Sequence, residues 1–342
     1  MITTNKIWRY TVPLLMAVCW LVCFGSTGFA EDVLVVKKKT SDDTFRRKGI
    51  IEEWLGYSVT ISSNGSLKEI DSTLIVELQT IWPAAYESGN RLAATGKTKQ
   101  AIRKYREALA EEKRPWAQRI IRSKLVTAYQ LIGNSTAAIN EFQTILAQDP
   151  NTRFMNRMPL PWSNRVQPVT EASDWLNSDQ AAVQLLGAGW SLISRKKEQA
   201  AAALDQLAGD LDPRIRDLAT AQLWRLQTQL NPKEVKQLQG IVDGMEPENR
   251  AGALLILANA EQKQGNLDAA LLNWMKVVTL HEDQSLLVAA SLSQTASALR
   301  SRDPNLTKQK IYPKPDLFTA ELRNRFPEST WAQQAMFDTG KN

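Results

Sequence analysis

Residues 96–108 read GKTKQAIRKYREA, and the spacing within this stretch recurs twice more in the chain. A glycine is followed by a small residue five positions later, a large aromatic at nine and a small or aliphatic residue at twelve. The three sets are Gly96-Ala101-Tyr105-Ala108, Gly133-Ala138-Phe142-Ile145 and Gly265-Ala270-Trp274-Val277. A glycine that ends one helix, followed by a second helix with small and aromatic core positions, is typical of a closely packed helix hairpin. The chain is therefore expected to be mainly helical.

The helix that follows Gly96 shows the expected apolar face. Ala101, Ile102, Tyr105, Ala108 and Leu109 recur at i, i+1, i+4, i+7 and i+8, which is one side of an α-helix. The small residues let a neighbouring helix approach, and the tyrosine between them supplies buried area. The period changes from about two to about 3.6 at Ile81, so helices are predicted from there onward.

This spacing resembles the tetratricopeptide repeat, whose helix hairpins stack into a right-handed α-solenoid. Gly89 stands at the small position of the first helix of copy one, and Pro150 at the closing proline of copy two. Val126 departs from the family, since a Gly or Ala is expected there. Ala258 fits in copy three, which has no closing proline. The resemblance implies a surface that binds proteins rather than an active site.

The helices between the second and third copies follow another pattern. Asp212-Pro213 opens a segment, residues 212–219, that resembles a HEAT-type repeat, and Asn231-Pro232 is a second helix start. Phe326–Ala332 is expected to begin a last helix that caps the array. The helical part is thus predicted as residues 81–150, resembling tetratricopeptide repeats, and residues 172–342, of mixed repeats. An irregular, Pro-rich connector, residues 151–171, separates them.

The resemblance also implies candidate binding residues. In tetratricopeptide arrays the partner lies in a groove lined by the first helix of each hairpin. By register these positions are Tyr86 and Asn90 in copy one, Ser123, Thr127 and Gln130 in copy two, and Asn259, Gln262 and Lys263 in copy three. They are mostly polar, as a groove for a peptide requires. A merely hydrated face is the alternative.

The first thirty residues have the order of a secretory signal. Lys6 and Arg9 precede an apolar run, residues 12–24, and small residues end at Ala30. This predicts a signal peptide cleaved after Ala30 and a periplasmic or secreted protein without stable membrane insertion. Retention of the segment as an anchor stays open, although the run is short for a membrane span. Both cysteines lie in this segment, so the exported chain is predicted to have no disulfide and no thiolate site.

Residues 31–80 predict a small β domain, either a barrel similar to SH3 or Sm folds or a curled sheet. Short strands are expected over residues 33–36, 49–54, 57–62, 67–70 and 74–80. Asn64-Gly65 is a strong hairpin signal, and Val59 and Ile61 alternate with polar residues. The lysines at 37–39 are expected on an edge strand, where they discourage aggregation. The net charge of +6 is mild and spread out, so no nucleic-acid partner is expected.

The sequence offers little for catalysis. His281 is the only histidine, and a surface or capping role is expected for it. Without a cysteine in the exported chain and with one histidine, no catalytic residue, metal site or cofactor is predicted. We expect a non-enzymatic scaffold that binds another envelope or secreted protein. The alternative is an accessory protein that binds cell-wall carbohydrate through exposed tryptophans, for which Trp162 in the connector is the best candidate. Neither the partner nor the oligomeric state can be predicted.

Overall fold

The computed structural model describes residues 31–339 except residues 165, 228–229 and 303–311. The predicted signal peptide, with both cysteines, therefore lies outside the described residues. The chain divides into two units. The β unit holds the described residues up to Glu52 together with Val59–Ile81, and the helical unit holds Glu53–Ser58 and the described residues from Trp82 onward. A mainly helical chain with a small N-terminal β domain was predicted, and the structure confirms a mainly helical chain with a small antiparallel sheet near the N-terminus.

The β unit is one five-stranded sheet with the order β4-β3-β2-β1-β5. The strands are β1 (Asp32–Lys37), β2 (Thr44–Leu55), β3 (Ser58–Ser63), β4 (Ser66–Asp71) and β5 (Ile75–Gln79), with a 3-10 turn η1 (Ser72–Leu74) before β5. β1 pairs antiparallel with β2 and with β5. The lysines around the end of β1 were expected on an edge strand. This was wrong, because β1 lies between β2 and β5. Lys37 and Lys38 instead form exposed ion pairs with Asp42 and Asp43.

One face of the sheet is apolar, and its register agrees with the sequence pattern. Val59 and Ile61 of β3 are buried and alternate with partly exposed polar neighbours, as predicted. Asn64 and Gly65 join β3 to β4 with positive φ values of 51° and 74°, the geometry of a two-residue type I′ hairpin loop. The sequence signal for this hairpin is confirmed.

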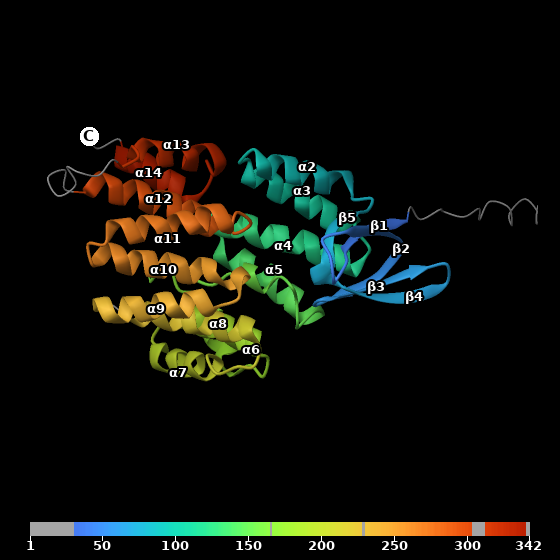
Figure 1. Ribbon diagram of the computed structural model, residues 1–342, viewed down its shortest axis with the longest axis horizontal. Coiled ribbons are helices and arrows are strands. Elements are labelled where there is room, and N and C mark those ends of the chain that lie inside the picture. The colour runs from blue at the N-terminus through green and yellow to red at the C-terminus, as the bar shows by residue number, and fades with distance from the viewer. Residues whose placement is uncertain (1–30, 165, 228–229, 303–311, 340–342) are drawn as a thin grey trace, which may run out of the picture. The chain divides into compact units, whose positions relative to one another are not determined.

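Helices make up the second unit, and most of them are arranged as antiparallel neighbours (Figure 1). The first two hairpins are α2 (Ala84–Ala94) with α3 (Thr98–Glu111) and α4 (Pro115–Leu131) with α5 (Ser135–Gln148). Then come η2 (Met155–Arg157), η3 (Thr170–Asn177), α6 (Ala181–Ser191), α7 (Lys197–Leu207), α8 (Pro213–Leu223), η4 (Trp224–Leu226), α9 (Pro232–Gly244) and η5 (Pro247–Asn249). The chain continues with α10 (Arg250–Lys263), α11 (Leu267–Leu280), α12 (Ser285–Ser301), α13 (Pro315–Arg325) and α14 (Thr330–Thr339).

The three matched stretches have the same local geometry. Gly96, Gly133 and Gly265 each lie between the two helices of a hairpin, with φ values of 72°, 78° and 79°. This left-handed conformation is strained for residues with a Cβ atom, which explains why glycine recurs at this position. At Gly89 of α2, an added Cβ would lie 2.7 Å from ring atoms of Tyr105 in α3. Two helices can therefore approach closely only because the position is glycine.

Ala101 of α3 is fully buried, so we expect overpacking when it is enlarged. Ala101→Leu should lower the free energy of unfolding by about 1–3 kcal/mol, measured by urea denaturation. Ala110→Leu in the same helix is the matched control, because Ala110 is exposed and its replacement adds the same atoms to solvent. Equal stability of the two variants would contradict the close packing of α3.

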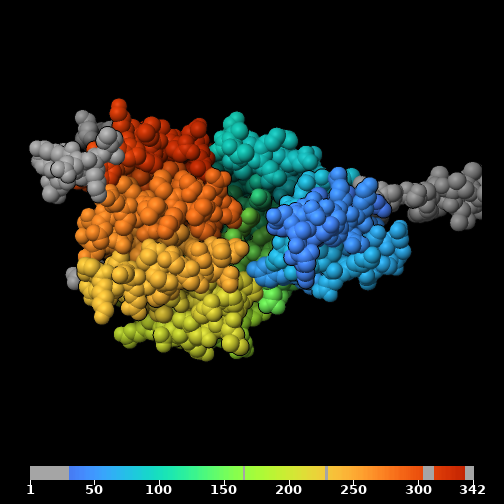
Figure 2. Space-filling model, in the orientation of Figure 1, coloured from blue at the N-terminus to red at the C-terminus, as the bar shows by residue number. Residues whose placement is uncertain are grey.

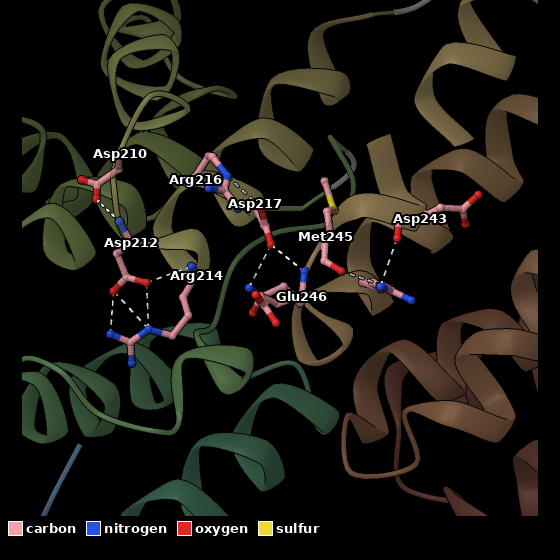
Figure 3. A network of polar contacts seen from close by, with 10 residues as sticks. Asp210, Asp212, Arg214, Arg216, Asp217, Asp243, Met245 and Glu246 are labelled. Carbon is pink, nitrogen blue, oxygen red and sulfur yellow. Dashed lines mark hydrogen bonds and ion pairs between the residues drawn. The ribbon is translucent and has the colours of Figure 1, made fainter. Parts of the chain in front are cut away.

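A polar network fastens α8 to its neighbours in the chain (Figure 3). Asp212 caps α8 by accepting a hydrogen bond from the backbone N–H of Arg214, with Pro213 at the first helical position, as the sequence predicted. The buried Asp217 accepts a hydrogen bond from the backbone N–H of Glu246 at 2.9 Å, so α8 holds the segment that joins α9 to α10. The charged residues of this motif thus have structural partners.

The connector is irregular, as expected, but it is packed against the helices. Arg214 of α8 donates hydrogen bonds to the carbonyl oxygens of Asn151 and Thr152, both at 3.1 Å. Trp190 of α6 donates from Nε1 to the carbonyl oxygen of Pro159 at 2.8 Å. Helices that follow the connector in sequence therefore fix its path.

Residues 53–58 belong to the helical unit although they include the end of β2 and the first residue of β3. The buried Arg119 of α4 pairs with Glu53 and donates from Nη2 to the carbonyl oxygen of Trp54 at 2.7 Å. The backbone N–H of Gly56 donates to Asp149 at 2.9 Å. The turn between β2 and β3, with the end of β2, is thus anchored to the ends of the second hairpin.

The last helices return to the first two hairpins (Figure 2). The carboxylate of Glu328 accepts a hydrogen bond from the backbone N–H of Lys99 at 2.6 Å. A Cβ added at Gly96 would lie 2.5 Å from Pro327, and one added at Gly133 would lie 2.7 Å from Thr330. The predicted terminal helix exists as α14, and the segment before it covers the turns of both hairpins. Within the described residues, none of the helices combines the length and apolar character required to cross a membrane.

Candidate functional site

The predicted binding residues of the first hairpin are engaged inside the helical unit. Tyr86 is buried, with its ring centroid 4.2 Å from that of Trp82 and 6.0 Å from that of Tyr105. Asn90 accepts a hydrogen bond from the hydroxyl of Tyr105 at 2.9 Å. Burial raises the pKa of Tyr86 and of Tyr105. These two residues of α2 therefore serve packing rather than an open groove.

The second hairpin shows the same arrangement. Ser123 is buried and donates to the carbonyl oxygen of Ile120 at 2.7 Å, while its hydroxyl accepts from Arg157 Nη1 at 3.0 Å. Thr127 donates to the carbonyl oxygen of Ser123 at 3.2 Å, and Gln130 is half-buried. Arg157 belongs to the connector, so the chain itself contacts the surface on which a partner was expected.

The connector covers this surface with apolar side chains as well. Met155, Met158 and Leu160 are buried in the same core cluster as Tyr86 and Leu125. An open groove along α2 and α4 was expected. The structure corrects that expectation, because burying two methionines and a leucine is worth more than exposing them to solvent.

Three cations surround the covered surface. The pKa of Lys124 is lowered to about 8, mainly by burial and secondly by the charge of Arg157. Burial also lowers the pKa of Arg157, and that of Arg153 to about 10. The guanidinium of Arg153 lies 3.8 Å from the ring centroid of Trp54, a cation–π contact. Asp283, which accepts a hydrogen bond from Asn156 at 3.1 Å, is the acidic neighbour of Lys124 and Arg157.

The third hairpin differs, because two of its predicted residues line a cavity. Asn259 and Lys263 of α10 border a cavity of about 460 Å³, whereas Gln262 is exposed outside it. Ile256, Asn259, Ala260 and Lys263 stand at i, i+3, i+4 and i+7, so one face of α10 forms a wall. Its remaining lining residues are Trp162, Ser163, Asn164, Trp224, Arg225, Gln227, Leu230 and Gln264. The volume is in the range of small-ligand sites.

Trp162 of the connector is positioned by a glycine of α10. A Cβ added at Gly252 would lie 2.2–2.3 Å from three atoms of the indole ring. The ring therefore rests directly on the helix backbone, and it is partly buried between two core clusters. The full exposure expected of Trp162 for carbohydrate binding therefore does not describe this side chain.

Arg225 gives the cavity its charge. Its side chain is only 6% exposed, and burial lowers its pKa to about 10. Nη1 donates to the carbonyl oxygen of Gly189 at 2.8 Å and to Oε1 of Gln222 at 2.6 Å, and Nη2 donates to the carbonyl oxygen of Ser163 at 3.3 Å. All three acceptors are neutral, and Nε has no hydrogen-bond partner among the described residues. With Lys263, the lining residues that the structure describes include two cations and no carboxylate.

Sequence reasoning missed Arg225. Arg225 stands in the sequence Leu223-Trp224-Arg225-Leu226, where apolar residues on both sides indicate that the cation is buried. A buried arginine needs acceptors, so this pattern was the available signal. Its position beside α10 could not be inferred, because these elements are distant in sequence.

Other candidates for chemistry are weaker. His281 caps α11, as expected, but it is buried rather than exposed, and burial lowers its pKa. Across residues 31–339, apart from the gaps given above, no three His, Cys, Asp or Glu side chains are grouped so that they could hold a metal ion.

No protein-family model, curated protein or solved structure matches this chain.

Proposed function

We propose that this chain is an exported, non-enzymatic binding protein that holds a peptide segment of another envelope or secreted protein in the cavity beside α10. The observation that carries this proposal is the cavity itself. Its wall is the first helix of the third hairpin, the face on which tetratricopeptide arrays bind peptides, and it includes Asn259 and Lys263. Export rests on the sequence of residues 1–30 alone.

We also propose that the helical unit is a divergent right-handed α-solenoid of helix hairpins and that the β unit curls toward a small barrel. Support for the solenoid comes from the matched glycine geometry of three hairpins and from the succession of antiparallel helices. Support for the curl comes from the five strands packed into under fifty residues, with the twelve-residue β2 next to strands of six residues, since sheets twist.

The binding proposal predicts that filling the cavity abolishes peptide binding. A library of random peptides is selected on the purified protein, and the Kd of each recovered peptide is measured from tryptophan fluorescence, since Trp162 and Trp224 line the cavity. Asn259→Phe should weaken binding at least tenfold, because the larger side chain occupies the space that the peptide requires. Circular dichroism confirms that the variant is folded.

Gln262→Phe is the matched control for this experiment. Gln262 lies on the same helix, is exposed and does not line the cavity, so this variant should bind like the unmodified protein. If Asn259→Phe leaves the affinity unchanged, the peptides bind elsewhere and the proposal fails. If no peptide is recovered, a peptide-binding function is also contradicted.

Carbohydrate binding is the second candidate, because the cavity combines two indole rings with the side-chain amides of Asn164, Asn259 and Gln264. Indoles stack on sugar rings, and amides pair with hydroxyl groups. Titration with cell-wall polysaccharide separates the two functions. A saturating fluorescence change that Asn259→Phe removes would favour the carbohydrate, and no change at millimolar sugar would exclude it.

A further inference from the structure

The charges of the described residues around the cavity are unbalanced. Arg225 and Lys263 line it, and in the part of the chain that the structure describes no Asp or Glu side chain does. Arg225 is almost entirely buried, yet its acceptors are two backbone carbonyls and one amide, all uncharged. A guanidinium removed from water is stabilised far better by a carboxylate than by neutral oxygens.

One edge of the Arg225 guanidinium has unused donors. Both hydrogens of Nη1 have acceptors, at 2.8 and 2.6 Å, whereas Nη2 makes one longer bond of 3.3 Å and Nε makes none within the described part of the chain. Nε has almost no accessible surface, so Nη2 is the donor left for a carboxylate in the cavity. The bond from Nη2 to the carbonyl oxygen of Ser163 is the longest of the three. A carboxylate can therefore replace this acceptor with the smallest loss of hydrogen-bond energy.

Lys263 adds a second positive charge at the exposed end of the wall. It lies in the last turn of α10, seven residues after Ile256, and its side chain is exposed. An exposed lysine at a rim attracts an anion from solution, and the buried arginine then fixes the anion's orientation. The indole of Trp162 forms a flat apolar wall of the same cavity.

We propose that the cavity selects peptide segments with a carboxylate, which Arg225 and Lys263 bind while an apolar part of the segment packs on Trp162. This inference rests on the proposed peptide-binding function and adds the chemical class of the ligand. The carboxylate belongs to a glutamate or aspartate side chain or to a chain end. Neutral segments of the same size bind weakly, because they leave the buried guanidinium without its anion.

The test compares two hexapeptides of equal length on the purified protein, hexaglutamate and hexaglutamine, by calorimetry and tryptophan fluorescence. Hexaglutamate should bind at least tenfold more tightly, and its affinity should fall as the salt concentration rises. Lys263→Glu should weaken hexaglutamate binding about tenfold without changing the melting temperature. Lys236→Glu is the matched control, since Lys236 is exposed on α9 and does not line the cavity.

Arg225→Gln tests the buried cation, and it should weaken hexaglutamate binding more than Lys263→Glu does. Because this variant can also loosen the fold, the exposed Lys263→Glu variant keeps the inference testable if Arg225→Gln does not fold. Equal binding of the two hexapeptides overturns the acidic preference while the peptide-binding function stands. Hexaglutamate binding that neither variant weakens places the anion elsewhere and also overturns the inference.

A third arm uses polygalacturonate, which has carboxylates on sugar rings. Binding of this polymer together with failure of hexaglutamate overturns the peptide ligand and favours an acidic glycan. Failure of all three probes overturns the inference itself, whereas the peptide-library selection decides the proposed function independently.

Discussion

Trp274→Ala is expected to lower the free energy of unfolding by about 3–5 kcal/mol. Trp274 is 0% exposed and lies at the aromatic position of the third hairpin, in the cluster that includes Ala258 and Ala270. Its Nε1 atom has no hydrogen-bond partner among the described residues, so the loss comes from packing alone. The small alanines around it cannot fill the cavity that the substitution leaves. Urea denaturation measures the effect.

Leu272→Ala provides the control for this experiment, because Leu272 is on the same helix and 59% exposed. It removes apolar atoms that already contact water, and its effect should stay within about 0.5 kcal/mol. A similar loss in both variants would show that the burial of Trp274 does not decide the result. That outcome would contradict the packing assigned to the third hairpin.

Lys124→Met is expected to stabilise the protein, and the gain should depend on pH. Lys124 has a pKa lowered to about 8 by burial and by the charge of Arg157, with Asp283 opposing that shift. Below pH 8 the folded chain keeps a charged lysine in a partly desolvated position, which costs on the order of 2 kcal/mol after allowance for solvent screening. Methionine has a similar length and no charge, so the variant should be more stable there by about that amount.

The sign of the pH dependence follows from the direction of the shift. Between pH 8 and about 10.5 the unfolded chain holds the proton of Lys124 more tightly than the folded chain does. The stability of the unmodified protein therefore rises with pH across this interval, relative to the variant, and the difference disappears near its upper end. Thermal unfolding of both proteins from pH 7 to pH 10.5 measures this. A constant difference, or the same result with the exposed Lys233→Met, would contradict the assignment.

Local features of the fold could be predicted because their causes are local. The glycines at 96, 133 and 265 are needed for the left-handed turn of each hairpin, and the Asn64-Gly65 turn needs positive φ at both residues. Asp212 and Asn231 cap their helices through side-chain bonds to backbone N–H groups two or three residues later. Such signals lie within a few residues of their effect, so a single sequence contains them.

The candidate site could be predicted only in part because it is assembled from distant segments. Asn259 and Lys263 follow from the register of one helix. In contrast, Arg225 binds Ser163, which is 62 residues away in the sequence, and Trp162 rests on Gly252, about ninety residues away. The covering of Ser123 by Arg157 likewise depends on the path of the connector. No periodicity encodes where a connector without regular structure will pack.

The bond between Glu328 and Lys99 joins segments 229 residues apart, and this has a consequence for how the helical unit comes apart. In a linear repeat array each repeat contacts only its neighbours, so the ends fray first and unfolding spreads inward. Here the contact of Pro327 and Thr330 with the turns at Gly96 and Gly133 ties the last segment to the first. Neither end can then open without breaking contacts of the other, so terminal fraying is suppressed and the unit loses its structure more nearly in one cooperative step. The same closure requires segments that are far apart in the sequence to meet during folding. It therefore slows folding, while the contacts that it makes resist opening of the folded unit.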